Sequence, residues 1–385
     1  MQKVHIIDPH SHTQLRSEFR LNNFNTIILS NLRLADVSSV PLNNNPDTRY
    51  TANGGVMNLI KKLTLYSGNQ QLDTISNFHK WYGFKNLIST QSEADGLKKP
   101  NTASALSINT EYIDLHQNVG EIPAYGFNGK FDVPLPVLED NNDLFFDDIR
   151  LVVEWNTAPA TVYSADGRPA SFTVNPPSLI YTEFLSKDYS ELKKIAQSKP
   201  FVWNAIEGER LDVPATTNGT VQPIDTRLRG FDNKTVTRMV VVNDSSTAND
   251  YCSRTHSVAM NAEKLNFRVN GRLIMPYNGI DNENQKLRSL NAWGEATVYQ
   301  GGQYTQETEG RLEESLRAMS GQFSYASFDI RQKINDLNIQ FQRTGKTGEP
   351  ATDESFLSQM DIYCFGEVLK QVKEDNKGNL MVMNL

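Results

Sequence analysis

The chain has 385 residues, and its 38 Lys and Arg against 45 Asp and Glu give a formal net charge of −7. This acidic balance excludes a general attraction to nucleic acid or to anionic membranes. A hydrophobic fraction of 38%, with 18 Phe, 14 Tyr and 4 Trp, excludes a disordered chain. The length exceeds what one core usually fills and favours two domains of ordinary size.

Two strands are predicted early in the chain, after a polar amino terminus. Residues 24–34 alternate between apolar and polar positions, and residues 59–66 run into the turn Ser67-Gly68-Asn69. The polar residues 1–20 that precede them are expected to form an N-terminal arm that contacts partners.

Residues 75–84 follow that turn and are predicted to form a short helix. Ile75, Phe78 and Tyr82 have the spacing of an amphipathic helix, and Ser76 is its predicted cap.

The end of the first half has clear boundaries. The alternating run 127–137 contains two prolines, which place it at a sheet edge or a strand entrance. Strands are predicted over residues 149–155 and 180–185. Residues 188–197 have an Asp cap, an acidic first turn and later lysines, which predict a helix. A Ser-Lys-Pro sequence ends this helix and places the domain boundary near residue 200.

The second half has the same strand-rich character. Residues 236–242 are mostly β-branched, and residues 265–274 alternate around an Asn-Gly turn of the hairpin type. One amphipathic helix is predicted over residues 310–319. Residues 378–383 are predicted to form a last hairpin strand.

Two segments of the first half match two segments of the second. The pattern around Ile149 matches the one around Ile330, 181 residues later, and the strand around Tyr181 matches the one around Tyr363, 182 residues later. A shared offset close to half the chain is what a tandem duplication leaves behind.

Short strands with turn signals, few helices and no alternation of strands with helices predict an all-β chain. We expect two tandem eight-stranded antiparallel jelly-roll sandwiches, with a few short helices in loops and at the junction. The expected division is an N-terminal arm at residues 1–20, a first jelly roll at 21–200 and a second at 201–385.

His10 and His12 are the sharpest candidates for chemistry. A His-x-His pair at a strand end holds a divalent metal in amidohydrolase barrels, with both imidazoles on one face. Such barrels need further ligands at the ends of later parallel strands, and none of the remaining candidates follows such a run: His79, His116 and His256. We therefore predict no metal ligand, and keep a metal-dependent hydrolase only as an alternative.

No catalytic or cofactor site is predicted elsewhere. The sequence contains neither a P-loop nor a G-x-S-x-G motif. The adjacent carboxylates Asp147-Asp148 and Glu313-Glu314 point apart on a strand or helix, and the lysine pairs at 98–99 and 193–194 fit a solvated surface. One aromatic group can stack a sugar but is more typical of a helix packed on its own sandwich: Phe78, Trp81, Tyr82 and Phe84.

Cys252 and Cys364 form no CxxC motif, so neither a zinc site nor a disulfide framework is predicted, and a reducing compartment is the default. No stretch approaches the roughly 20 apolar residues of a membrane span. Residues 1–12 are too polar for a signal peptide. We therefore expect a chain that is assembled in the cell interior, with its Asn-x-Ser/Thr sites unmodified: Asn218, Asn233 and Asn243.

The order of elements before the junction consists of the stretch Phe131 to Pro136, the strand 149–155, the run 179–185 and the helix 188–197. This order resembles the end of the first jelly roll in double jelly-roll major capsid proteins. That family belongs to tailless icosahedral double-stranded DNA viruses of the adenovirus, polinton-like, virophage and giant-virus type.

Other segments extend the resemblance. Leu63 to Gly68 with Leu72-Asp73 is similar to the family's strand segment that continues through Gly to a hydrophobic residue and Asp. Residues 265–271 and 362–370 are similar to its closing strands.

The resemblance implies a structural role without catalytic residues or cofactors. It implies a homotrimer that forms pseudo-hexameric capsomers, which tile an icosahedral shell around a double-stranded DNA genome. The implied partners are neighbouring capsomers, penton proteins and minor capsid proteins, with no direct sequence-specific binding of nucleic acid. The implied location is the virion. The remaining alternative is a non-capsid β-sandwich that binds a partner or serves in a fibre or baseplate.

Overall fold

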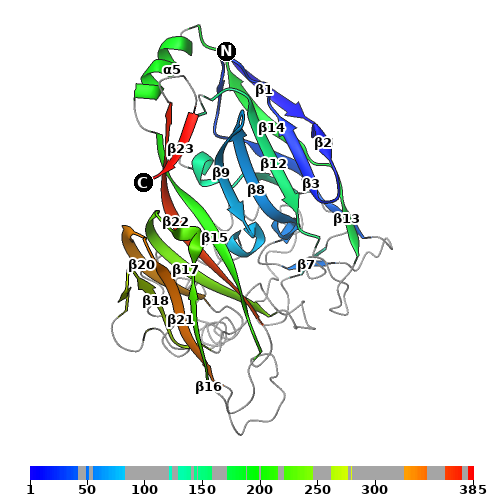
Figure 1. Cartoon of the computed structure of the whole chain (residues 1–385). Coiled ribbons are helices and arrows are strands. Elements are labelled where there is room, and N and C mark those ends of the chain that lie inside the picture. Colours follow the sequence, from blue (N-terminus) through cyan, green and yellow to red (C-terminus); the bar gives the residue numbers. More distant parts are fainter. Residues whose placement is uncertain are drawn as a thin grey trace, which may run out of the picture.

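A computed structural model describes most of the chain, and strands dominate it (Figure 1). The described residues are 1–41, 49–51, 55–82, 121–123, 129–139, 143–144, 146–157, 171–187, 189–198, 201–215, 221–245, 262–275, 279, 325–344, 360–374 and 380–385. The expected helix at 310–319 and most of the long polar loops lie outside these residues.

The first half forms two five-stranded antiparallel sheets. One has the order β1-β14-β5-β11, with β4 also paired to β14, and the other has the order β2-β3-β12-β8-β9. The strands span Gln2–Ile7 (β1), Ser11–His12 (β2), Arg16–Arg20 (β3), Ile27–Ile28 (β4), Arg33–Val37 (β5), Ile60–Ser67 (β8), Gln70–Ser76 (β9), Gly129–Asp132 (β11), Ile149–Trp155 (β12) and Ser178–Phe184 (β14).

The second half forms a five-stranded and a four-stranded antiparallel sheet. The first has the order β15-β22-β17-β20, with β23 also paired to β22, and the second has the order β16-β21-β18-β19. The strands span Phe201–Val213 (β15), Val221–Arg227 (β16), Thr235–Ser245 (β17), Ala262–Val269 (β18), Arg272–Leu273 (β19), Tyr325–Lys333 (β20), Leu337–Thr344 (β21), Met360–Glu374 (β22) and Leu380–Asn384 (β23).

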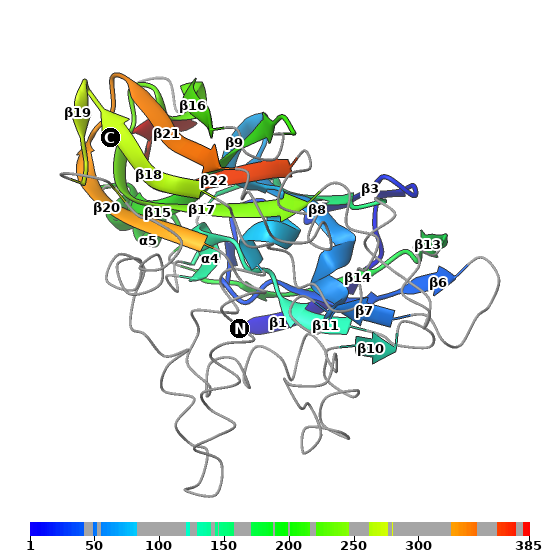
Figure 2. The same cartoon turned by 90° about the horizontal axis from the view of Figure 1, so that it is seen from below.

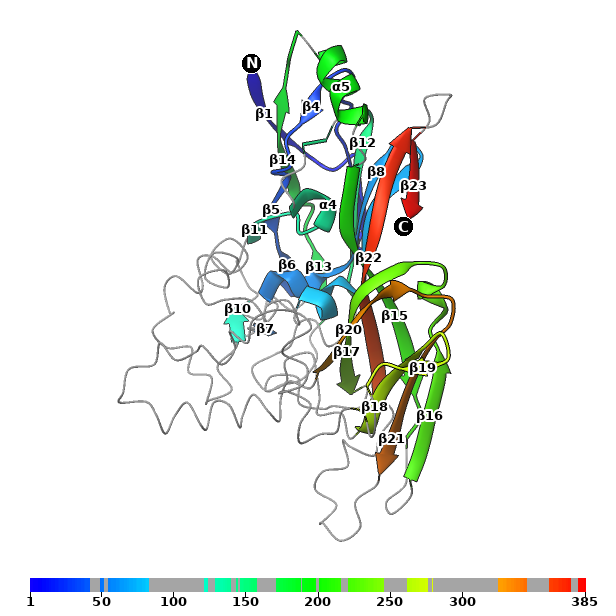
Figure 3. The ribbon, with the colours of Figure 1, turned by 90° about the vertical axis from the view of Figure 1, so that its left-hand side faces the viewer.

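Small elements complete the fold. Two-stranded sheets pair β10 with β7 and β13 with β6. These elements and the helices span Ser39–Pro41 (β6), Arg49–Thr51 (β7), Glu121–Pro123 (β10), Phe172–Val174 (β13), Gly55–Leu59 (η1), Pro136–Glu139 (α4), Tyr189–Ser198 (α5) and Arg229–Phe231 (η4). Helix α4 lies between the β1-β14-β5-β11 sheet and β15 (Figures 2 and 3).

The two halves repeat one topology. The eight main strands of the first half are β1, β3, β5, β8, β9, β11, β12 and β14, and those of the second half are β15 to β22. In each half the first of these pairs with the eighth, the eighth with the third, and the third with the sixth, as β1-β14-β5-β11 and β15-β22-β17-β20. The remaining four strands of each jelly roll also pair in one common order, as β3-β12-β8-β9 and β16-β21-β18-β19. Eight strands connected in this way form a jelly roll. The chain is therefore an all-β double jelly roll, as the sequence predicted.

The strand equivalence corrects one of the two sequence matches. Tyr181 in β14 and Tyr363 in β22 occupy equivalent strands. Ile149 and Ile330 do not, because Ile149 begins β12 whereas Ile330 lies in β20, and the equivalent of β12 is β21. An apolar residue flanked by Asp and Arg is typical of any half-exposed strand, so that short match carried no positional information.

The amino terminus also differs from its expected form. Residues 1–20 contain three paired strands, and β1 runs antiparallel to β14 from Gln2 opposite Phe184 to Ile7 opposite Leu179. The expected arm is therefore part of the first jelly roll, with β1 at a sheet edge.

Several local predictions are confirmed. β8 and β9 join at the predicted turn, and α5 forms after β14. Asn270 and Gly271 have φ values of 49° and 81°, as a two-residue hairpin turn requires. The run 127–137 splits into the edge strand β11 and the helix α4.

Two other predictions are wrong in their boundaries. Residues 24–34 contain only the two-residue strand β4 and the first two residues of β5, with Asn25 before β4 at φ 56°. The first-half helix begins at residue 78 and not at Ser76, because β9 continues through Ser76. The carbonyl of Asn77 accepts bonds from the backbone N–H groups of Lys80 (3.0 Å) and Trp81 (3.3 Å).

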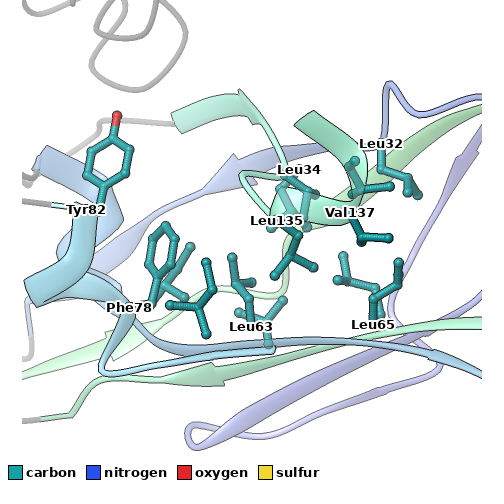
Figure 4. Packing of buried hydrophobic residues seen from close by; sticks show 14 of the residues in the cluster. Leu32, Leu34, Leu63, Leu65, Phe78, Tyr82, Leu135 and Val137 are labelled. Atoms are coloured by element: carbon teal, nitrogen blue, oxygen red, sulfur yellow. The ribbon is translucent and has the colours of Figure 1, made fainter. Parts of the chain in front are cut away.

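Buried side chains form two clusters that share the sheet β15-β22-β17-β20. The larger cluster fills the first jelly roll, where β8, α4 and the turn at residues 78–82 meet (Figure 4). Val240 and Val242 point into this cluster, while Met239 and Val241 point into the smaller one. Because both faces of β17 are buried, its sequence is a nearly continuous apolar run.

Candidate functional site

Of the two histidines that were considered and rejected as metal ligands, His12 connects strands. His12 lies 2.8 Å from the Ser17 hydroxyl through Nδ1 and 3.2 Å from the Val174 carbonyl through Nε2. Its ring therefore ties β2 to β3 and to β13. His10 is exposed. Within the described ranges, no group of three or more His, Cys, Asp or Glu residues is placed to hold a metal ion.

The Asp147-Asp148 pair connects the first jelly roll to α5. One carboxylate oxygen of Asp147 accepts hydrogen bonds from the Asn25 backbone N–H (3.1 Å) and the Tyr189 hydroxyl (3.3 Å). Burial, and secondly this carboxylate, raise the pKa of Tyr189 to about 12. Asp147 thus fixes the helix against the entrance of β12. Glu313-Glu314 lies outside the described residues.

The aromatic group after β9 packs inside the protein and offers no sugar platform. Phe78, Trp81 and Tyr82 expose 0%, 6% and 2% of their surface, and Phe84 lies outside the described residues. Cys364 is fully buried, and burial raises the pKa of its thiol, which makes it an inert core residue. Cys252 lies outside the described residues.

The junction between the jelly rolls contains a buried carboxylate. Asp73 on β9 is 0% exposed and accepts backbone hydrogen bonds from Thr74 (2.9 Å) and from Val137 of α4 (3.0 Å). Burial raises the pKa of Asp73 to about 6, although Lys370 and the two N–H donors oppose the rise. Asp73 therefore holds α4 in place and faces a lysine from the second jelly roll.

Lys370 connects Asp73 to a second carboxylate. The side chain of Lys370, on β22, is 7% exposed, and its Nζ lies 2.8 Å from Glu207 on β15. Glu207 also bonds Lys234. Burial alone would raise the pKa of Glu207, but Lys370 and Lys234 outweigh it and lower that pKa. The result is a low-exposure charge network of alternating sign that spans both jelly rolls.

The outer face of the β2-β3-β12-β8-β9 sheet is charged. Glu18 on β3 bonds Arg16 and Arg20 at 2.9 Å each and lies 3.6 Å from Arg150 on β12. Burial alone would raise the pKa of Glu18, but the three arginines outweigh this effect, and the pKa lies below its ordinary value. The Arg150 guanidinium also stacks 4.5 Å from the centre of the Tyr66 ring. Three cations around one carboxylate leave a net positive patch on this face.

Sequence reasoning identified none of the junction charges as functional. Asp73 had one signal, its place in the capsid-like segment that ends with Leu72-Asp73. Lys370 likewise ends the capsid-like segment 362–370, whereas Glu207 had no signal; the two residues lie 163 positions apart, and nothing in the sequence indicates their contact.

Among the helices of the described residues, none is long and apolar enough to cross a membrane.

No protein-family model matches the sequence, and no curated protein is significantly similar to it. The structure, in contrast, is similar to solved structures along almost its whole length. VP54 of PBCV-1, in a crystal structure fitted into a reconstruction of the virophage Sputnik, has a TM-score of 0.56 at 10% identity, covering 100% of this chain and 97% of that one.

Two further structures are similar. For the mavirus major capsid protein the TM-score is 0.56 at 10% identity, covering 99% of this chain and 90% of that one. For the Faustovirus major capsid protein the TM-score is 0.55 at 7% identity, and the match covers 96% of this chain and 90% of that one. The chain therefore has the double jelly-roll fold of these capsid proteins.

Proposed function

We propose that this chain is the major capsid protein of an icosahedral virus. Three copies form a homotrimer with a pseudo-hexameric outline, and these capsomers tile a shell around a double-stranded DNA genome. The observation that carries the proposal is the double jelly roll over the whole chain, a fold shared with the capsid proteins of mavirus and Faustovirus.

The internal duplication supports the pseudo-hexameric outline. Three chains with two jelly rolls each present six similar sandwiches, so a trimer tiles like a hexamer. Tiling needs a fixed angle between the two sandwiches of a chain. The shared core and the Asp73, Lys370 and Glu207 network supply that rigidity, because both bridge the two halves.

The charge balance supports a shell that encloses nucleic acid without gripping it directly. A net charge of −7 repels the phosphate backbone at long range, so contact with the genome is expected to pass through other components. We place the protein in the virion, assembled inside the host cell, with neighbouring capsomers, penton proteins and minor capsid proteins as its partners.

Light scattering and negative-stain imaging of the purified protein test the proposal. Three copies of 43.4 kDa give about 130 kDa, and a hexagonal outline is expected at that mass. A monodisperse monomer at all concentrations, or a trimer without a hexagonal outline, would contradict it.

A further inference from the structure

Among the described residues, no strand pairs with the outer side of β1, so β1 is a sheet edge. It ends the order β1-β14-β5-β11 and lies at the outside of the molecule (Figures 1 and 3). Met1 and Leu185 exchange backbone hydrogen bonds of 3.0 and 2.9 Å. Because such bonds alternate along an antiparallel pair, the N–H and C=O groups of Gln2, Val4 and Ile6 point away from β14, toward the open edge.

Most other edges of the four large sheets, as far as they are described, are blunted or covered, and β23, with five residues in continuous register, lies beside β9. β9, β11 and β20 contain register shifts, β16 contains Pro223, and β2 and β19 have two residues each. β15 lies against β9, where a Cβ on Gly208 would be 3.6 Å from the Ser76 carbonyl oxygen. β1 instead has six residues in continuous register and no proline. An edge of this kind is a template for an added strand.

The side chains of this edge are apolar on the outer face. Val4 and Ile6 are 64% and 70% exposed. Across the pair, Ile6 lies opposite Ile180 and Gln2 opposite Phe184, while Val4 lies opposite Thr182. Covering β1 would therefore remove Val4 and Ile6 from water, although Gln2 and Thr182 interrupt the apolar surface.

We propose that β1 pairs antiparallel with β1 of a second copy of this chain, centred on Val4, so that one sheet continues through both copies. The inference rests on the proposed self-assembly and adds to it a specific contact. Val4 of one copy lies opposite Val4 of the other, and Gln2 opposite Ile6, through the groups that point away from β14.

Charge selects this register and supports a second copy as the occupant. On the inner face, Lys3 lies beside Glu183 of its own chain and opposite His5 of the second copy. His5 in turn lies 2.8 Å from its own Glu183 and stacks on Tyr181 with ring centroids 4.8 Å apart. Each lysine is therefore flanked by a carboxylate of its own chain and an imidazole of the second copy.

Other registers of the β1–β1 pair bring less favourable side chains opposite each other. A shift toward the chain start would place Lys3 directly opposite Lys3, and like charges opposite each other destabilise a strand pair. A shift toward the strand end would place the two His5 rings opposite each other and Lys3 opposite the half-buried, apolar Ile7.

Symmetry assigns the contact a place in the shell. A strand paired with its own copy is an isologous, two-fold contact, whereas the contacts within a trimer are heterologous. The β1 pair therefore joins chains of two different trimers.

Cysteine cross-linking tests the register. In the proposed pair the two Val4 Cα atoms lie about 5.5 Å apart, within the range of a disulfide. The two Gln2 residues are offset by four residues along the strand pair, so their Cα atoms lie roughly 13 Å apart, which is beyond that range. Mild oxidation of full-length Val4→Cys is expected to give a covalent dimer of about 87 kDa, twice 43.4 kDa, on a non-reducing gel. Its rate should exceed that of the matched Gln2→Cys control at least tenfold. Equal rates, or no dimer, would overturn the proposal.

A second variant removes the pairing without a cysteine. Val4→Pro deletes an N–H that faces the edge and leaves the bonds to β14 intact, a position where a strand tolerates proline. It should keep the circular dichroism spectrum and the trimer mass but lose the concentration-dependent pairing of trimers in sedimentation velocity. Unchanged pairing contradicts the β1 contact alone, whereas a monomeric parent protein that still cross-links through Val4→Cys contradicts the trimer alone.

Discussion

Trp81 of the first jelly roll packs on Phe365 of the second, with ring centroids 5.6 Å apart and ring planes inclined by 54°. Phe365 is fully buried in the cluster that fills the first jelly roll, although it lies on β22. The second jelly roll therefore completes the core of the first, and the two sandwiches behave as one packed body.

Phe365→Ala is expected to loosen this junction. Removing a buried phenyl ring costs about 3–5 kcal/mol through lost burial and the remaining cavity. The free energy of unfolding, measured in urea, should fall by that amount. Hydrogen exchange should also rise in β9 and in residues 78–82, on the far side of the junction.

Phe328→Ala is the matched control. Phe328 is equally buried, but it packs on Phe267 at 4.8 Å in the smaller cluster, away from the first jelly roll. It should lower stability by a similar amount and leave exchange in β9 unchanged. Equal exchange of β9 in both variants would show that Phe365 has no special role at the junction.

Asp73 should give the stability a defined pH dependence. Its folded pKa of about 6 lies above the ordinary 3.8, so the folded state binds this proton more tightly than the unfolded state. Its stabilising contribution is complete below pH 3.8 and is lost as pH rises through 6. A shift from 3.8 to about 6 corresponds to about 3 kcal/mol.

Asp73→Asn isolates this contribution. The difference in unfolding free energy between the parent protein and the variant, measured at pH 4, 5, 6 and 7, should change by about 2.4 kcal/mol across the series, because pH 4 still lies above the unfolded pKa of 3.8. The parent protein should lose stability relative to the variant as pH rises. A difference independent of pH would mean that Asp73 keeps an ordinary pKa in the folded protein.

The sequence predicted the fold class because strand periodicity and turn chemistry are local signals. The Asn270-Gly271 hairpin and the helix after β14 needed only such signals. β15 was missed because Glu207, Glu209 and Arg210 interrupt its apolar pattern. Glu207 is tolerated there because Lys370 and Lys234 lie beside it, contacts that local patterns do not encode.

Gly271→Ala should destabilise the β18–β19 hairpin through the backbone alone. Gly271 has φ of +81°, and an added Cβ would meet nothing within 4 Å. The expected loss is about 1 kcal/mol or more of unfolding free energy, because a side chain disfavours this conformation. Asn270→Ala at φ 49° should cost more, since it also removes the hydrogen bonds that Asn270 makes to Lys333 and Asn335. If the parent and Gly271→Ala proteins were equally stable, Gly271 would not adopt the positive φ of this turn in the folded protein.

Lys370→Met tests whether the junction network depends on its buried cation. The change preserves most of the side-chain volume but leaves Asp73 without its positive neighbour and Glu207 with Lys234 alone. Removing one partner of a buried charge network costs roughly 3–5 kcal/mol, because the remaining charges stay desolvated. Lys373→Met, on the same strand but exposed, should change stability by less than about 0.5 kcal/mol.

The loss in Lys370→Met should shrink below pH 6, where Asp73 becomes protonated and neutral. A loss that is the same at pH 5 and pH 8 would show that Lys370 acts through Glu207 and not through Asp73.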